Sequence, residues 1–126
     1  MLNNKRATGM RRLVDATSYS AMGLKAAWHN EAAFRQEVAL VVVLIPAAFW
    51  LGTTGMQRAL LIFSSLLILI VELLNSAVEA AIDRIGPEIH PLSEQAKNMG
   101  SAAVLMSLIA TALVWGLVAW ERWGSI

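Results

Sequence analysis

The sequence has no cysteine and few charged residues. Without cysteine, disulfides, thiol nucleophiles and thiolate metal sites are excluded. The two histidines, His29 and His90, lie far apart along the chain, which argues against a histidine metal site. Charged residues make up 15% and hydrophobic residues 57% of the 126 residues. A soluble domain of this size cannot bury so much apolar surface, so the composition predicts one integral membrane domain over residues 1–126.

The apolar residues are gathered in three long runs. No charged residue occurs in 38–51 or 59–71, and 102–120 is apolar apart from a few small or hydroxyl-bearing residues. At about 1.5 Å of helical rise per residue, the last run nearly matches a hydrocarbon core of about 30 Å. The sequence therefore predicts an all-α membrane protein with three transmembrane helices.

Turn signals place the ends of these helices. Gly52 and Gly55 predict a short turn between two antiparallel helices, and Pro46 is expected inside the first of them. The second helix, at roughly thirty residues, exceeds the bilayer, so one of its ends must project from the hydrocarbon. Gly86, Pro87 and Pro91 break the chain after it, and Ser93 is predicted to cap the third helix. We expect these helices at about 32–51, 56–85 and 94–120.

An amphipathic helix is predicted before the first span, over residues 12–28. Apolar residues recur there at every third or fourth position, at Leu13, Thr17, Ala21, Leu24 and Trp28, with basic residues off that stripe. This pattern suits a helix lying in the membrane interface. Packing of the same stripe on its own protein is the alternative.

The basic residues predict the orientation. Eight of the ten lysines and arginines lie before or at the start of the first span or near the connection between the second and third, the exceptions being Arg58 and Arg122. The positive-inside rule then places the N-terminus and that connection in the cytoplasm. Three spans put the C-terminus on the other, periplasmic side.

A row of polar side chains runs along the second span. A helix turns by about 100° per residue, so Asn75, Glu79 and Asp83 all fall within about 60° of Glu72. An ionisable residue at a bilayer centre costs about 2.5–3.5 kcal/mol on insertion scales, so such residues usually face a protein interior and mark function. The alternatives are polar contacts that join helices, or a row whose lower end lies outside the lipid.

The acids lie at different depths in the membrane, and each depth suits a different chemical role. Glu72 lies deepest in the apolar run, and a buried carboxylate suits a group that accepts a proton near neutral pH. Glu79 lies about 10 Å nearer the cytoplasm, where Glu31 could join it as an oxygen ligand for Mg²⁺. Asp83 is the weakest candidate, because it lies near the end of the span and is followed by Arg84.

Polar residues also begin the third helix, at Glu94, Lys97, Asn98 and Ser101. Lys97 could pair with phosphate, although a lysine at this position also serves as an interfacial anchor. The phosphate-binding loop G-x-x-x-x-G-K-[ST], the G-x-G-x-x-G loop and a kinase catalytic loop are all absent. The standard nucleotide-binding folds are therefore excluded.

The residues alone leave three classes of protein. These are an enzyme at the membrane interface, a carboxylate-lined transporter and a non-catalytic membrane subunit. A transporter would carry polar residues across the whole bilayer, whereas residues 59–71 offer only Ser64 and Ser65. A structural subunit requires neither three aligned acids nor Lys97. The enzyme interpretation is favoured.

Three segments resemble the bacterial integral-membrane diacylglycerol kinase family. They are Glu31-Ala-Ala-Phe-Arg35-Gln-Glu37, the row Glu72-x-x-Asn75-x-x-x-Glu79-x-x-x-Asp83-Arg84, and Ala96-Lys97-Asn98-Met-Gly100-Ser101-Ala-Ala-Val. The resemblance extends from about Arg12 to Trp120. It implies a homotrimer in the bacterial inner membrane, with active sites shared between subunits. It also implies that MgATP phosphorylates diacylglycerol to phosphatidic acid, and no nucleic acid partner is expected.

The resemblance also implies residue roles. Glu72 matches the general base of the family, Glu31 and Glu79 match the metal-binding acids, and Asn75 matches a polar active-site residue. Further positions match groups around the nucleotide phosphates or the lipid headgroup, namely Arg12, Tyr19, Ser20 and Lys97. Asn98 is expected at the nucleotide phosphates with Lys97, and Ser101 and Asp83 are expected as further polar residues of the same site.

One position departs from the family pattern. An acid usually follows the lysine, whereas this chain has Asn98 after Lys97. We expect this loss of charge to lower turnover without abolishing it. A related branch of the family phosphorylates undecaprenol with the same catalytic residues, and the motifs here look more like the diacylglycerol branch.

Overall fold

The fold consists of helices joined by short connections. The computed structural model describes residues 8–124, so the basic residues Lys5 and Arg6 lie outside the described part. No strand occurs between residues 8 and 124. The elements in order are α1 (Met10–Asn30), α2 (Ala32–Leu51), α3 (Gly55–Ile85), α4 (Pro91–Ala119) and the short π-helix η2 (Trp120–Gly124).

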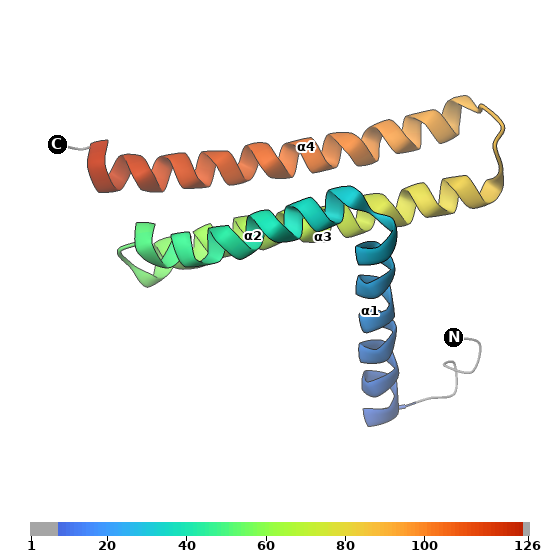
Figure 1. The fold of residues 1–126 in the computed structure, drawn as a ribbon, viewed down its shortest axis with the longest axis horizontal. Coiled ribbons are helices and arrows are strands. Elements are labelled where there is room, and N and C mark those ends of the chain that lie inside the picture. The colour runs from blue at the N-terminus through green and yellow to red at the C-terminus, as the bar shows by residue number, and fades with distance from the viewer. Residues whose placement is uncertain (1–7, 125–126) are drawn as a thin grey trace.

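Three helices are long and apolar enough to cross a membrane, as the sequence predicts. They are α2, α3 and the continuous helical segment formed by α4 and η2, Pro91–Gly124. The three run side by side, and α3 packs against both α2 and α4 (Figure 1). Many large apolar side chains on them are exposed, including Val43 at 67% and Phe63 at 62%. Since a soluble protein rarely exposes so many, these faces suit contact with lipid, and the chain is a membrane protein.

Local chemistry explains where α3 begins and ends. Thr54 is its N-cap and accepts a hydrogen bond from the Gln57 backbone N–H at 3.1 Å. The Gln57 side chain accepts from the Thr53 backbone N–H at 2.8 Å, which satisfies a second free donor of the turn. Gly86 ends the helix with φ of 145°, a conformation that side chains disfavour. The glycine after Ile85 therefore stops a helix that would otherwise continue.

The start of α4 corrects the sequence prediction. The helix begins at Pro91, three residues before the expected Glu94, and its N-cap is His90 in place of Ser93. The His90 imidazole accepts a hydrogen bond from the Leu92 N–H through Nδ1 at 3.1 Å. Proline is favoured at the first helical position because its missing N–H would have no partner there and its φ already suits the helix. Pro91 therefore starts a helix, whereas the sequence analysis treats it as a break.

Helix α1 lies crosswise to the other three (Figure 1). Its apolar side chains remain accessible, with Leu13 63%, Leu24 49% and Trp28 47% exposed, and Ala27 is the only residue of α1 classed as buried. The bend between α1 and α2 is at Glu31, whose backbone is extended. Arg35 stabilises this bend by donating to the Trp28 carbonyl at 2.7 Å. The apolar stripe is thus not buried against its own chain.

Two sets of contacts hold the helices together at the end remote from α1, which we call the far end. A core of Ala48, Leu51, Leu61 and Val118 joins all three long helices. Arg122 of η2 donates to the backbone carbonyls of Trp50 and Leu51, the latter at 3.0 Å, and lies over the rings of Trp50 and Trp123. We call this second set the Arg122 clamp. It gives the last carbonyls of α2 partners that the helix itself cannot supply.

A polar seam joins α3 to α4 between the far end and the acids. Thr111 Oγ1 lies 2.9 Å from the Ser64 carbonyl oxygen and 2.8 Å from that of Ser107, and it can donate to either. The Trp115 indole N–H donates to Ser65 Oγ at 3.3 Å. Ser64, Ser65 and Thr111 are all buried. These bonds fix the register of α3 against α4, and thereby the relative positions of side chains further along both helices.

Candidate active site

The polar row on α3 is graded by burial. Glu72 is only 4% exposed and Asn75 9%, whereas Glu79 is half-buried and Asp83 is exposed. Burial falls from Glu72 to Asp83 because α3 and α4 continue past the junction of α1 and α2 towards their own connection, where no other helix of residues 8–124 covers them (Figure 1). The projecting end that the length of α3 requires is therefore the end that carries Asp83.

Four carboxylates gather around the buried end of the row. Glu72 experiences like-charge repulsion from Glu79 and from Glu31 at the start of α2. Glu37, six residues further along the chain in α2, experiences repulsion from Glu72. The structure therefore brings together the three acids that the sequence analysis singles out, Glu31, Glu72 and Glu79, and adds Glu37 to them.

Glu37 is a site residue that sequence reasoning missed. Its Oε2 is buried and has no hydrogen-bond partner, which is costly for a carboxylate and suggests that a ligand supplies the donor. In the sequence, Glu37 is named only as the last residue of the first segment that resembles the kinase family. A usable signal was present: Glu37 and Glu72 lie at similar distances in sequence from the turn at Gly52–Gly55. Antiparallel helices joined by a short turn bring such residues to the same depth.

Asn75 connects the buried and half-buried acids. Its Nδ2 donates to Glu79 Oε1 at 3.4 Å, a long bond that still orients the amide. Its Oδ1 is buried without a partner, as is the hydroxyl oxygen of the neighbouring Ser76. The Asn75 oxygen faces Gly100 of α4. An unpaired amide oxygen beside carboxylates is a hard ligand of the kind that Mg²⁺ takes.

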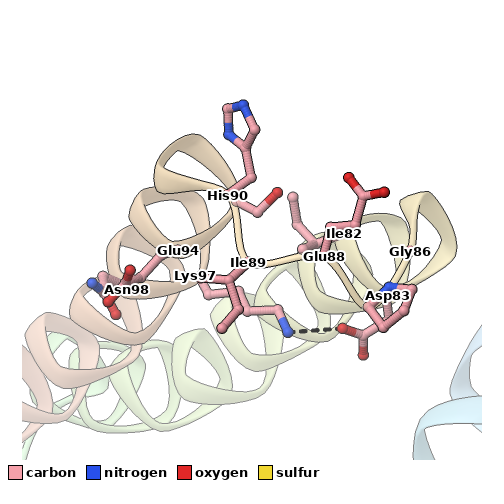
Figure 2. Close-up of a pocket in the computed structure, with 11 residues that line it drawn as sticks. Ile82, Asp83, Gly86, Glu88, Ile89, His90, Glu94, Lys97 and Asn98 are labelled. Carbon is pink, nitrogen blue, oxygen red and sulfur yellow. Dashed lines mark hydrogen bonds and ion pairs between the residues drawn. The ribbon is translucent and has the colours of Figure 1, made fainter.

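A pocket of about 420 Å³ lies where α3 ends and α4 begins (Figure 2). Lys97 Nζ reaches across it to Asp83 Oδ1 at 2.7 Å. The predicted residues Glu94 and Asn98 also line it. Its polar lining also includes Glu88, His90 and Ser93, none of which was predicted as a site residue. The connection carries no motif, so only the folded arrangement of the two helix ends reveals this pocket.

A second pocket, of about 560 Å³, lies in the angle between α1 and α3. Small side chains line most of it, and its polar lining consists of Ser20, Asn30, Glu31 and Ser76. The predicted residue Ser20 is thus placed near the acids, although its hydroxyl donates to the Ala16 carbonyl at 2.9 Å. Ser101 is exposed and lines neither pocket.

Two predicted residues lie apart from the acids. Arg12 is exposed near the free end of α1, and Tyr19 is half-buried in the middle of that helix. Because α1 is one continuous helix from Met10, Arg12 lies about 28 Å along its axis from Glu31. An arginine side chain cannot span that distance, so Arg12 does not reach the acids of its own chain.

The donor set fits a magnesium ion that is shared with a phosphate. Within residues 8–124 no three histidine or acidic side chains stand close enough to hold a metal by themselves. Mg²⁺, however, is usually held by one or two carboxylates together with phosphate oxygens and water. Glu31 and Glu79 both lie close enough to Glu72 to repel it, and Glu79 accepts a hydrogen bond from the Asn75 amide, so two carboxylates are available for an ion that takes its other ligands from phosphate and water.

The profile of the prokaryotic diacylglycerol kinase family matches residues 18–119. The chain belongs to this family. The diacylglycerol kinase of Escherichia coli (strain K12) is 50% identical over 124 residues, covering 98% of this chain and 100% of that protein. That of Pseudomonas aeruginosa is 53% identical over 114 residues, covering 90% and 93%. That of Helicobacter pylori (strain 26695) is 46% identical over 111 residues, covering 88% and 87%. As a member of this family, the chain is a membrane-bound lipid kinase, and the expectation from its motifs is confirmed.

Proposed function

We propose that this diacylglycerol kinase family member transfers the γ-phosphate of MgATP to the hydroxyl of 1,2-diacylglycerol, giving phosphatidic acid at the cytoplasmic face of the bacterial inner membrane. The graded burial of the α3 row carries the proposal. A reaction between a lipid and a soluble nucleotide needs one group at the depth of the lipid and others in contact with water. Glu72 and Asp83, at opposite ends of one row, meet these two requirements.

Glu72 acts as the general base in this proposal. It takes the proton from the lipid hydroxyl, whose oxygen attacks the γ-phosphorus. The new P–O bond forms as the bond between the γ-phosphorus and the β–γ bridging oxygen breaks, and ADP leaves. Glu37 lies beside Glu72, and its unpaired Oε2 would accept a hydrogen bond from the lipid glycerol and orient it. Burial of Glu72 would keep water away from the attacking oxygen.

The nucleotide is held nearer the water. Glu31 and Glu79 would hold the Mg²⁺, with the Asn75 amide N–H holding the Glu79 carboxylate in place. The ion supplies neutralisation of the phosphate charge that builds up during transfer. Lys97, Asn98 and the connection that includes Glu88 line a pocket of about 420 Å³. This pocket is where the nucleotide would lie, with the Lys97 ammonium near its phosphates.

The separation of Arg12 from the acids supports an assembly with shared sites. Within one chain Arg12 cannot contribute to the site formed by Glu31, Glu72 and Glu79. A second copy could bring its α1 to the same site, as a homotrimer of this family would. The exposed apolar stripe of α1 and the basic residues beside it suit a helix at the cytoplasmic interface. This orientation places the N-terminus inside and the C-terminus in the periplasm.

The hydroxyl groups of the polar seam argue against a transporter. Ser64 and Ser65 donate to the Leu61 carbonyl at 3.1 and 2.7 Å, and Thr111 bonds to backbone carbonyls. These groups are satisfied within the helices, so they offer no continuous polar path from Glu72 to the far end.

The deciding experiment is a kinase assay in proteoliposomes, with MgATP and either diacylglycerol or undecaprenol. We expect phosphatidic acid from diacylglycerol. Phosphorylation of undecaprenol alone would assign the chain to the other branch of the family. Glu72→Gln should retain assembly and MgATP binding and lose about 10²–10⁴-fold in turnover. Glu121→Gln, at the far end, is the matched control and should work normally. Normal turnover in Glu72→Gln would exclude Glu72 as the base.

Shared sites have a separate test. Arg12→Ala and Glu72→Gln subunits, each inactive alone, are unfolded together and refolded as mixed oligomers. Sites built from two chains would regain activity, because some sites would then contain neither substitution. If the mixtures stay as inactive as the separate variants, each chain carries its own complete site.

A further inference from the structure

Helix α4 meets the Asn75 side chain of α3 at Gly100. A Cβ atom added there would lie 2.2 Å from Asn75 Oδ1 and 3.3 Å from Asn75 Cγ. The same Cβ would lie 3.9 Å from Asn75 Cα, an ordinary van der Waals distance. The two helix backbones therefore leave room for a methyl group, and it is the Asn75 amide that occupies the space.

That amide has one constrained orientation. Its Nδ2 donates to Glu79 Oε1 at 3.4 Å, so its Oδ1 is directed towards Gly100. Rotating the amide by half a turn would bring its oxygen against the Glu79 carboxylate, which is unfavourable because both are acceptors. Oδ1 is buried and unpaired in this position, although Ser76 also has a buried hydroxyl oxygen without a partner one residue away.

We propose that Gly100 is a positioning residue of the kinase reaction: its lack of a side chain holds the Asn75 amide between α3 and α4, directed at Glu79. Gly100 itself touches no substrate and acts only through Asn75. The inference rests on the proposed function, in which Glu79 and Asn75 serve the metal-bound phosphates. Gly100→Ala would force the short Asn75 side chain into another rotamer, since moving its tip is easier than separating two packed helices.

The test compares two glycines on the same helix. An added Cβ at Gly116 meets nothing within 4 Å, so Gly116→Ala is the matched control. We expect Gly100→Ala to keep the melting temperature within a few degrees and to lose about tenfold or more in kcat/KM for MgATP, with the KM for Mg²⁺ raised. Gly116→Ala should stay within about twofold. Normal kinetics in Gly100→Ala would overturn the proposal.

A double-substitution cycle separates positioning from packing. If Gly100 acts through Asn75, adding Gly100→Ala to Asn75→Ala should cost nothing further, because the clashing amide is already gone. If the two losses add, or if Gly100→Ala unfolds while the double variant does not recover its stability, Gly100 serves packing and the proposal fails.

A readout without substrate keeps this inference separate from the proposed function. In ¹⁵N-labelled protein without nucleotide, the side-chain amide signal of Asn75 should move in Gly100→Ala and stay in place in Gly116→Ala. An unmoved signal overturns the positioning role whatever the activity. If the signal moves but the wild-type chain phosphorylates no lipid, the proposed function fails and the link from Gly100 to the reaction fails with it.

Discussion

Replacement of Thr111 by valine tests how strongly the polar seam joins α3 to α4. Valine keeps the shape of threonine and removes the hydroxyl, which lies 2.9 Å from the Ser64 carbonyl oxygen in a buried position. The hydroxyl has one proton for two nearby carbonyls, so one hydrogen bond is lost. Interhelical hydrogen bonds in membrane proteins average about 0.6 kcal/mol and reach about 1.7. We therefore expect Thr111→Val to lower the free energy of unfolding by about 0.6–1.7 kcal/mol.

The measurement is unfolding in mixed micelles of increasing SDS content, followed by circular dichroism. Ser107→Ala is the control, because the buried Ser107 hydroxyl donates within α4, to the Val104 carbonyl at 2.7 Å. Equal losses in the two variants would show that the bond between the helices adds nothing. Thr111 lies about 21 Å along α4 from Lys97. The bond from Trp115 to Ser65 still holds the register of the two helices in Thr111→Val, so the kinetics of the folded enzyme should not change.

Three further substitutions probe the pocket and the far end. Asn98→Asp should raise turnover by up to about fivefold, because it restores a charge beside Lys97, and equal turnover would show that this charge is unimportant. Asp83→Asn should raise the KM for ATP by up to about fivefold at unchanged kcat, since Lys97 loses its orienting partner in an exposed place; a large fall in kcat would refute this supporting role. Arg122→Gln should lower the free energy of unfolding by about 1 kcal/mol at normal turnover, and no change in SDS titration would show that the Arg122 clamp contributes nothing.

The long helices were predictable because their signals are local. Apolar runs identify the spans, and the glycines at 52, 55 and 86 mark breaks that need no knowledge of distant residues. The predicted start of α4 was wrong because proline affects a helix in two ways. It breaks a helix when it lies in the interior, and it favours a helix when it is the first residue. The two roles of Pro91 are distinguished only by His90, whose backbone is extended and whose imidazole accepts a hydrogen bond from the Leu92 N–H.

The site was predictable where it depends on one helix. Helical periodicity alone places Glu72, Asn75, Glu79 and Asp83 on one face, and the order of their burial follows from the end of the apolar run. Glu37 was missed because its depth matters only once α2 is paired with α3. The contact between Asn75 and Gly100 depends on the register of α3 against α4, which buried bonds such as the one from Thr111 fix. No local pattern encodes that register.

The Arg122 clamp has a consequence for the order in which the chain is made. The Gly52 carbonyl accepts a hydrogen bond from Arg58, six residues later in the sequence. The Leu51 carbonyl accepts one from Arg122, which is 71 residues later. While the ribosome is still synthesising α4, the hairpin of α2 and α3 must therefore enter the bilayer with the last carbonyls of α2 exposed to headgroups or water. Arg122 is synthesised 71 residues after Leu51, so this end of the bundle can close only after α4 and η2 have been made.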